Sequence, residues 1–221
     1  SMKEKTVLVV GNSWPVRQIF SKRNFRVLSE EKPEAPDIVC FTGSSDITPA
    51  FYNQQKLSYT RGIDKQRDIN EKAMFNRYPQ AFKVGICRGA QLLNVLSGGN
   101  MYQHVDNHQT GYHTCIDLIT KKKVTLNTVH HQMMVPGNNA DVICIANEST
   151  YRHSKPRQIE LPYDPEVIWY EKTKSLCFQA HPEYINVGAS YNQTEVYFFE
   201  LLSRFFMDNV DESKETERKV G

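Results

Sequence analysis

A cysteine between two glycines is the residue of this chain best suited to nucleophilic chemistry. Cys87 lies in Gly85-Ile86-Cys87-Arg88-Gly89, after the apolar run Phe82–Ile86 and before apolar residues that recur at helical spacing from Ala90 to Leu96. A strand that passes directly into a helix must turn sharply, and glycines on both sides of the apex relieve the crowding. The pattern is that of a nucleophile elbow with a thiol in place of the hydroxyl. A helix N-terminus favours the thiolate, so the segment predicts a cysteine nucleophile.

A histidine that can act as the base follows a second strand-like run. The run Leu176–Gln179 is followed by Ala180, His181, Pro182 and Glu183. Pro182 is expected to hold His181 at a rigid strand end. Glu183, two residues on, can accept the imidazole N–H and so fix the tautomer and orientation of the ring. The order of cysteine, histidine and glutamate is compatible with one site on neighbouring strand ends.

The elements that must position these segments follow from the apolar patterns. Seven short runs predict strands: Thr6–Val10, Arg26–Leu28, Ile38–Thr42, Phe82–Ile86, Val142–Ala146, Val167–Tyr170 and Leu176–Gln179. Four stretches predict helices: Val16–Lys22, Ile63–Tyr78, Arg88–Leu96 and Gln193–Met207. Alternating strands and helices in the first half favour a mostly parallel sheet covered on both faces, whereas residues 113–132 are more typical of antiparallel strands. Ligand sites lie at the carboxyl ends of parallel strands, where Gly43, Cys87 and His181 all fall.

Length and composition agree with an enzyme domain. The 221 residues predict a single catalytic domain over residues 1–207, followed by a charged, disordered tail over residues 208–221. The formal net charge of +2 argues against a nucleic acid partner, and Lys121–Lys123 is interpreted as a hairpin turn. No apolar run reaches the length of a membrane span and no leader peptide is expected before Val7, so we expect no membrane association.

The five cysteines show no spacing typical of a disulfide framework. Cys40, Cys144 and Cys177 lie inside apolar strand-like runs, as buried core thiols do. We therefore expect a reducing, cytoplasmic compartment in which Cys87 stays free for chemistry.

Three further segments accompany the cysteine and histidine segments. They are the loop Phe41–Pro49, the charged set Asp64, Arg67, Asp68 and Glu71, and the segment Asn127–Gln132. Together with Gly85–Gln91 and Gln179–Glu183, these segments resemble the class I glutamine amidotransferase superfamily, and within it the γ-glutamyl hydrolase-like, peptidase-type branch. The resemblance extends from about Val7 to about Phe206. Five spaced motifs in the right order make it specific.

The resemblance implies a fold and an oxyanion hole. The fold is α/β, with a central mostly parallel sheet flanked by helices as in a flavodoxin-like three-layer sandwich, and with an antiparallel β extension. Main-chain N–H groups of Gly43 or Ser44 and of Arg88 are implied as the oxyanion donors. The sequence departs from the branch at Ser44, where a second glycine is usual, and the Cβ of serine restricts positive φ. We interpret the guanidinium of Arg88 as a structural or cleft-rim charge rather than a catalyst.

The resemblance also implies residues that contact the substrate. Gln91 is placed beside the glutamyl group, on the helix that follows the nucleophile. His130 and His131 are assigned to substrate binding; on a strand their side chains alternate, so one is expected to face the cleft and the other to support it from the sheet. Ala180 stands where a bulky aromatic is common, which predicts room for a larger substrate beside His181.

Three histidines, His104, His108 and His113, have spacings that a metal ion could use. No cysteine or carboxylate cluster completes a ligand set with them, and the resemblance offers no metal. We therefore expect neither a metal site nor a cofactor.

These residues predict hydrolysis of a γ-glutamyl amide bond in a small-molecule substrate. The reaction proceeds through a γ-glutamyl thioester on Cys87, with His181 as acid and base and Glu183 as orienter. Two alternatives remain open: the glutaminase component of an amidotransferase, which passes ammonia to a partner synthetase or ligase, and a binding protein that has lost catalysis. Arg88 and His130–Gln132 favour the hydrolase over the glutaminase component. The sequence leaves the oligomeric state open, a homodimer included.

Overall fold

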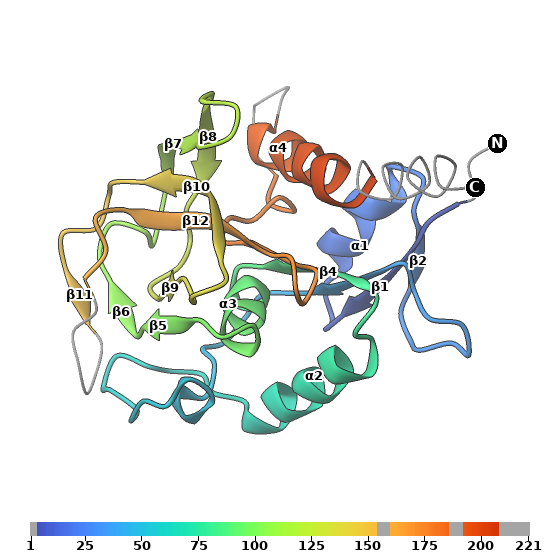
Figure 1. Cartoon of the computed structure of the whole chain (residues 1–221), viewed down its shortest axis with the longest axis horizontal. Helices are drawn as coiled ribbons and strands as arrows, with labels where there is room; N and C mark the ends of the chain where they lie inside the picture. Colours follow the sequence, from blue (N-terminus) through green and yellow to red (C-terminus); the bar gives the residue numbers. More distant parts are fainter. Residues whose placement is uncertain (1–3, 154–159, 186–191, 208–221) are drawn as a thin grey trace.

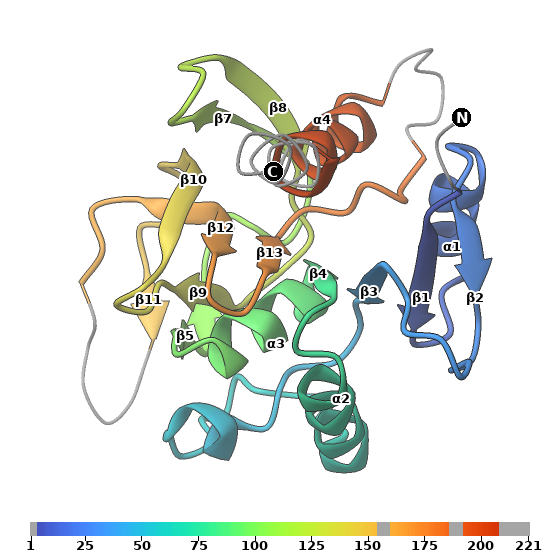
Figure 2. The same cartoon turned by 45° about the vertical axis from the view of Figure 1, so that its right-hand side comes forward.

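One large sheet, parallel in one part and antiparallel in the other, runs through the molecule. The computed structural model describes residues 4–153, 160–185 and 192–207, so the tail predicted over residues 208–221 lies outside the described residues. The sheet has nine strands in the spatial order β2 (Arg26–Leu28), β1 (Thr6–Val10), β3 (Ile38–Phe41), β4 (Phe82–Ile86), β13 (Ser175–Phe178), β12 (Asp164–Tyr170), β10 (Asp141–Ala146), β7 (Tyr112–Asp117) and β8 (Lys123–Asn127) (Figures 1 and 2).

The pairing of these strands divides the sheet at β13. From β2 to β13 every neighbouring pair is parallel, and from β13 through β12, β10 and β7 to β8 every pair is antiparallel. The predicted parallel sheet with an antiparallel extension is therefore confirmed. The carboxyl ends of β3, β4 and β13 lie side by side, because the register pairs Phe41 with Gly85 and Ile86 with Phe178.

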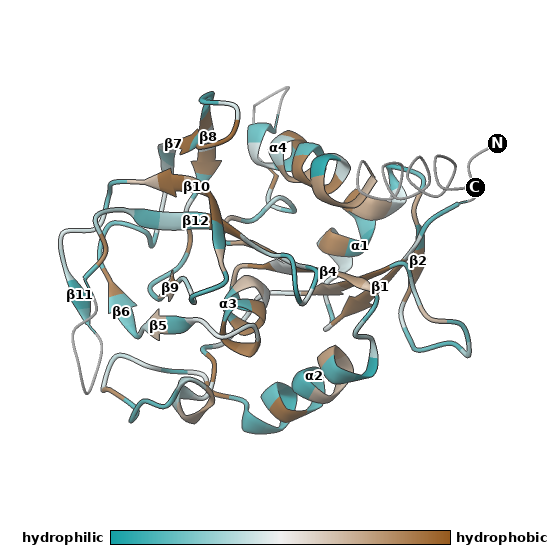
Figure 3. Ribbon diagram, viewed as in Figure 1, coloured by the Kyte–Doolittle hydropathy of each residue, from teal (hydrophilic) through white to brown (hydrophobic). Residues whose placement is uncertain are grey.

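Helices cover both faces of the parallel part. They are α1 (Trp14–Ser21), α2 (Lys65–Arg77), α3 (Arg88–Leu96) and α4 (Gln193–Leu202), with a 3-10 turn η1 (Pro49–Tyr52) and a π-helical segment η2 (Ser203–Met207). α1 and α4 lie on one face, and α2 and α3 lie on the other (Figures 1 and 2). Side chains alternate along β3, so Ile38 and Cys40 join the core under α1 and α4, while Val39 and Phe41 join the core under α3. Apolar residues concentrate in the sheet, whereas α2 is mostly polar (Figure 3).

The helices begin where the sequence provides capping side chains, with one exception. Ser13, Asp64 and Asn192 each accept a hydrogen bond from the main-chain N–H three residues on, which satisfies a donor at the start of α1, α2 and α4. α3 begins after Cys87 without a side-chain cap. Its first N–H groups are thus available to a ligand, as at other helix N-termini that bind anions.

Most predicted elements are present, with small shifts at their ends. All seven predicted strands occur, the predicted antiparallel pair is β7 and β8, and the helix predicted over Ile63–Tyr78 begins at Lys65 and ends at Arg77. Four short strands of two or three residues were not predicted: β5 (Asn100–Tyr102) pairs with β9 (Met133–Val135), and β6 (His104–Val105) pairs with β11 (Arg152–His153). All five cysteines are free and buried.

The predicted hairpin turn at Lys121–Lys123 is also present. Lys121 adopts a positive φ of 64° between β7 and β8, and Lys123 is the first residue of β8. Within residues 4–153, 160–185 and 192–207, no helix is both long enough and apolar enough to cross a membrane.

Candidate active site

Cys87 occupies a strained turn between β4 and α3. Its φ of 54° and ψ of −109° lie in a region that side chains with a Cβ rarely adopt. Its N–H donates to the carbonyl oxygen of Phe178, at 2.9 Å. Glycines make the turn sterically accessible: a Cβ on Gly85 would lie 2.3 Å from the main chain of Gly89, and a Cβ on Gly89 would lie 2.0 Å from the carbonyl oxygen of Phe41. The glycine pattern seen in the sequence thus serves the close packing of α3 on β3 and β4.

His181 and Glu183 form a buried pair at the end of β13. Nδ1 of His181 lies 2.7 Å from Oε1 of Glu183, and both side chains are largely buried. Burial alone lowers the pKa of His181, but the sulfur of Cys87 and the carboxylate of Glu183 outweigh it and raise this pKa from 6.5 to about 10. The ring of Tyr184 stacks flat on His181, with 4.1 Å between the ring centroids. The predicted nucleophile, base and orienter are thus neighbours.

Two amide side chains hold the main chain and the sulfur of this site. Asn127 donates from Nδ2 to the carbonyl oxygen of His181 at 2.7 Å and accepts from the N–H of His181 at 2.8 Å. Gln179 points Nε2 at Sγ of Cys87, 3.7 Å away. Gln179 in turn accepts a hydrogen bond from Gln91 at 3.2 Å. Sequence reasoning matched Asn127 and Gln179 to motifs but assigned them no function.

The predicted oxyanion loop approaches both Cys87 and His181. A Cβ on Gly43 would lie 3.3 Å from Cε1 of His181 and 3.7 Å from Cβ of Cys87, so the main chain of Gly43 borders both side chains. Ser44 adopts a φ of 123°. This conformation suits glycine and costs serine about 1–3 kcal/mol. The loop therefore keeps a glycine-type backbone despite the departure at Ser44.

A buried ionic network connects α2, α3 and this loop. The guanidinium of Arg88 is 1% exposed and contacts the carboxylates of Asp68 and Glu71, the latter at 2.7 Å. Arg67 donates from Nε to Glu71 at 2.6 Å and from its terminal nitrogen to the carbonyl oxygen of Gly43 at 3.0 Å. The guanidinium of Arg88 is therefore a structural charge rather than one at the cleft rim, because it is buried and its two terminal nitrogens contact carboxylates of α2.

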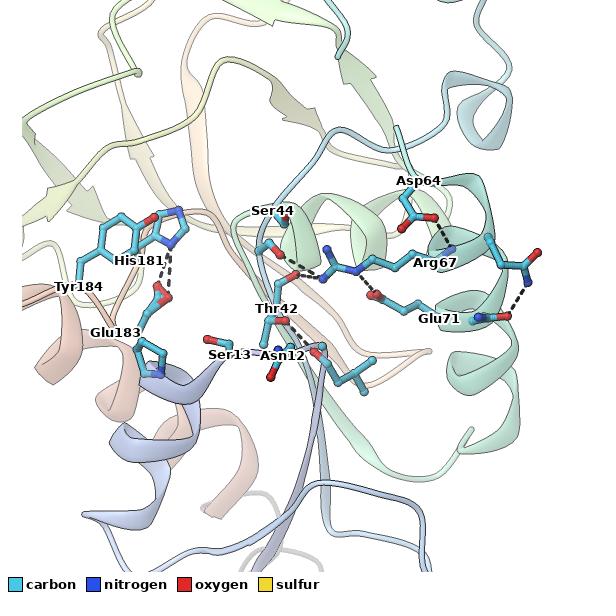
Figure 4. A pocket seen from close by; sticks show the side chains of 16 residues that line it. Asn12, Ser13, Thr42, Ser44, Asp64, Arg67, Glu71, His181, Glu183 and Tyr184 are labelled. Carbon is cyan, nitrogen blue, oxygen red and sulfur yellow. Dashed lines mark hydrogen bonds and ion pairs between the residues drawn. The ribbon is translucent and has the colours of Figure 1, made fainter. Parts of the chain in front are cut away.

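A cavity of about 770 Å³ opens beside His181. It is lined by Val10–Ser13, Pro15, Thr42–Ser44, Asp64, Gln66, Arg67, Asn70, Glu71, His181, Glu183 and Tyr184. Figure 4 shows His181, Glu183 and Tyr184 on one side of it and Arg67 and Glu71 on the other, with Thr42 and Ser44 between them. Its volume is in the range of small-molecule sites. Ala180 belongs to the core and does not line this cavity, and the aromatic ring beside His181 comes from Tyr184.

The predicted substrate residues do not line this cavity, and neither does Cys87. Gln91, His130 and His131 are absent from its lining. The expectation that the two histidines alternate on a strand was wrong, since both lie in the loop between β8 and β9. His131 contacts the carboxylate of Asp46 at 2.8 Å. Nδ1 of His130 donates to the carbonyl oxygen of Gln132 at 2.7 Å, and burial lowers the pKa of His130 well below its usual value.

The three histidines whose spacing could suit a metal ion lie at two different places in the structure. His104 faces His131, with 3.3 Å between their Nδ1 atoms. His108 and His113 lie together, with ring centroids 5.0 Å apart, and Glu166 joins them. The expectation that no carboxylate completes a ligand set was therefore wrong for these two histidines. Glu166 stands more than 50 positions along the chain, on β12, so no local spacing could have indicated it.

Comparisons with known proteins agree with this architecture. The family model of peptidase C26 matches residues 33–150, just over half of the chain. The glutamine amidotransferase-like protein YvdE of Lactococcus lactis is 38% identical over 69 residues, which are 30% of this chain and only 29% of that protein's length. A glutamine amidotransferase structure from Thermotoga maritima has a TM-score of 0.59 at 14% identity, over 97% of this chain and 94% of that one. The structure of PurLQS from the same organism has a TM-score of 0.56 at 12% identity, over 95% of this chain and all of that one. The predicted fold class is thus confirmed.

Proposed function

Because the chain belongs to the peptidase C26 family of class I glutamine amidotransferase-like proteins, we propose that it hydrolyses a γ-glutamyl amide bond with Cys87 as nucleophile. One observation carries the proposal: the elbow holding Cys87, the pair of His181 and Glu183, and the main chain of Gly43 converge on one point. A histidine with a pKa of about 10 is protonated at neutral pH, and such an imidazolium stabilises an adjacent thiolate.

The chemistry follows from these neighbours. The Cys87 thiolate attacks the δ-carbonyl carbon of the γ-glutamyl group and produces a tetrahedral oxyanion. N–H groups of the loop at Gly43 or Ser44 and of Arg88 stabilise this oxyanion; the loss of one such donor typically raises the barrier by about 3 kcal/mol. His181 protonates the departing amine, which leaves a γ-glutamyl thioester on Cys87. His181 then takes a proton from the water that hydrolyses the thioester, while Glu183 orients its ring.

Two groups of contacts support the γ-glutamyl hydrolase-like branch. The ionic network of Arg88, Asp68, Glu71 and Arg67 joins the nucleophile helix to the oxyanion loop. The segment Asn127–Gln132, the second signature of the branch, fixes the main chain of the catalytic histidine. The five free thiols agree with our prediction of a cytoplasmic protein.

A second candidate function is that of a glutaminase component, which releases ammonia for a partner synthetase. The likeness to PurLQS in fold favours it. The two functions differ in what the isolated chain can do. A hydrolase contains its nucleophile, base and oxyanion donors on one chain, whereas a glutaminase component is often nearly inactive until its partner completes the oxyanion hole.

The test is turnover by the purified chain without ATP or partner protein. We expect it to release p-nitroaniline from γ-glutamyl-p-nitroanilide and amines from a panel of γ-glutamyl amines, faster than it releases ammonia from glutamine. The Cys87→Ala variant is the matched control for contaminating hydrolases. Reaction with free glutamine alone, and only after a synthetase is added, would contradict the hydrolase and support the ammonia donor.

A further inference from the structure

A cluster of buried titratable side chains lies in the antiparallel part of the sheet. His108 precedes β7, His113 lies on β7, and Glu166 lies on β12. Their exposed fractions are 0%, 6% and 1%. None of the three lines the cavity beside His181, and the proposed hydrolysis uses none of them. Three ionisable groups without solvent need a reason to be there, because burial of a charge is costly unless it is compensated.

The cluster is short of hydrogen-bond partners. Both carboxylate oxygens of Glu166 and both ring nitrogens of His113 are buried without a hydrogen bond. Nε2 of His113 and Oε1 of Glu166 are 3.1 Å apart, an ion-pair distance, but the contact does not have hydrogen-bond geometry. Buried polar atoms in native proteins nearly always have a partner, and an unpaired one commonly marks a missing ion or water.

Three potential ligand atoms converge, and those of His113 and Glu166 lack a hydrogen bond. Nδ1 of His108, Nε2 of His113 and one oxygen of Glu166 all lie within 4.8 Å of one another. Oε1 of Glu166 is 3.1 Å from Nε2 of His113 and 3.8 Å from Nδ1 of His108. Tetrahedral zinc with bonds near 2.1 Å places its ligand atoms about 3.4 Å apart. The two edges that involve Glu166 bracket this value, and the third, between Nδ1 of His108 and Nε2 of His113, is within 4.8 Å. An ion at the centre therefore needs side-chain adjustments on the order of 1 Å.

The surroundings of His108 fit a metal ligand. Its Nε2 lies 2.7 Å from Oδ2 of Asp164. A carboxylate in this position accepts the proton of one ring nitrogen and so leaves the lone pair of the other ring nitrogen free for a metal ion. Asp164 is itself held by the N–H and hydroxyl of Ser149, at 2.8 and 2.6 Å. Thr128 donates its hydroxyl to the carbonyl oxygen of His108 and places Oγ1 3.0 Å from Nδ1. When the Thr128 hydroxyl donates to that carbonyl, its oxygen lone pair and that of Nδ1 face the same point, as two ligands of one cation would.

We propose that His108, His113 and Glu166 bind one divalent transition-metal ion, with zinc as the best match to two imidazoles and one carboxylate. The fourth position belongs to water or to Oγ1 of Thr128. The ion would brace β7, β12 and the loop before β7. It would also support the nucleophile indirectly: His130 stacks on His108 with centroids 4.5 Å apart, and Sγ of Cys87 lies 3.8 Å from the carbonyl oxygen of Val129.

The experiment measures metal retention in the full-length chain. The Cys87→Ala background removes the thiol that could compete for zinc. Chelator-treated protein is incubated with zinc sulfate, freed of excess metal by gel filtration, and analysed by elemental mass spectrometry and thermal unfolding. We expect one zinc per chain and a Tm several degrees above that of the metal-free protein. Adding His113→Asn or Glu166→Gln should abolish zinc retention and the rise in Tm. Adding His153→Asn, which replaces a histidine outside the cluster, should leave zinc retention and the rise in Tm unchanged.

Two outcomes would overturn the proposal. One is a folded Cys87→Ala protein that retains no zinc and shows no change in Tm. That result would indicate that a proton, and not a metal ion, is shared by the three side chains. The other is equal zinc retention after His113→Asn and Glu166→Gln, which would place the ion elsewhere. If these variants fail to fold, cobalt titration of the Cys87→Ala protein decides: visible bands of tetrahedral cobalt with nitrogen and oxygen ligands are expected, and their absence counts against the site.

Discussion

The guanidinium of Arg67 donates a hydrogen bond to the carbonyl oxygen of Gly43, 3.0 Å away. Arg67 is fixed by Glu71 at 2.6 Å, and Glu71 also accepts a hydrogen bond from Arg88, the residue after the nucleophile, at 2.7 Å. The loop and the helix that carry the proposed oxyanion donors are thus tied together through charged side chains. Oxyanion stabilisation depends on donors that are in position before the reaction begins.

This arrangement predicts that Arg67→Gln lowers kcat more than it changes KM. Loss of the hydrogen bond to Gly43 lets the loop move, and a tenfold fall in kcat corresponds to about 1.4 kcal/mol of transition-state stabilisation. The measurement is steady-state kinetics together with thermal unfolding, with the exposed Lys65→Gln on the same helix as control. A fall in Tm with unchanged kcat would assign Arg67 a purely structural function.

For Cys87→Ala we expect no measurable hydrolysis and a retained fold, because alanine is smaller and meets the same backbone strain. In the wild type, iodoacetamide should alkylate Cys87 before the other four cysteines. Cys87 is 8% exposed, whereas Cys40, Cys115, Cys144 and Cys177 are 0% exposed. Peptide mass spectrometry after a short reaction time gives the order. Equal labelling of Cys87 and Cys40 in folded protein would exclude the proposed nucleophile.

The variants His181→Asn and Glu183→Gln should differ in residual activity. His181 transfers protons in both steps, so its loss should cost nearly as much as the loss of Cys87, since residues that act as a unit are not additive. Glu183 only orients and polarises the ring, at 2.7 Å from Nδ1, so Glu183→Gln should keep measurable turnover. Both are compared at saturating substrate. Equal inactivation of the two variants would require a different role for Glu183.

The titration of His181 gives a pH prediction. Its pKa of about 10 in the folded protein exceeds the ordinary value of 6.5. The protonated form therefore contributes stability that is fully present below pH 6.5 and is lost as the pH rises to about 10. NMR of the Cε1–H group should show no titration of His181 between pH 5 and 8 in the wild type. In Cys87→Ala the midpoint should fall, because the sulfur is a main cause of the raised pKa. A wild-type midpoint near 6.5 would contradict the ion pair.

Gly89→Ala should destabilise the fold by about 3 kcal/mol, the upper range for overpacking a core. Its Cβ would lie 2.0 Å from the carbonyl oxygen of Phe41, and rigid main chain cannot yield. Gly98→Ala is the matched control: its φ is 104°, but no atom lies within 4 Å, so only backbone strain of about 1–2 kcal/mol is expected. Denaturant unfolding measures both. Similar losses of unfolding free energy in the two variants would show that the close contact between Gly89 and Phe41 does not determine the cost of a Cβ at this position.

Patterns confined to a few neighbouring residues were sufficient to predict the frame of this protein. Continuous apolar runs predicted the strands of the parallel sheet, because burial on both faces leaves no polar alternation. The spacing of Gly85, Cys87 and Gly89 predicted the elbow, because the sharp turn would place a Cβ on Gly85 2.3 Å from the main chain of Gly89. The order of His181 and Glu183 predicted their contact, because two residues on one turn remain neighbours in any fold.

Contacts between distant segments were decided by the tertiary structure alone. The partners of Arg88 in the core and the meeting of Glu166 with His108 and His113 depend on how strands align and where loops return. A shift of one residue in the register of β12 would turn Glu166 to the other face of the sheet. Local sequence patterns determine which residues are buried and how the backbone turns, but the pairing of side chains far apart in the chain is fixed only when the whole sheet assembles.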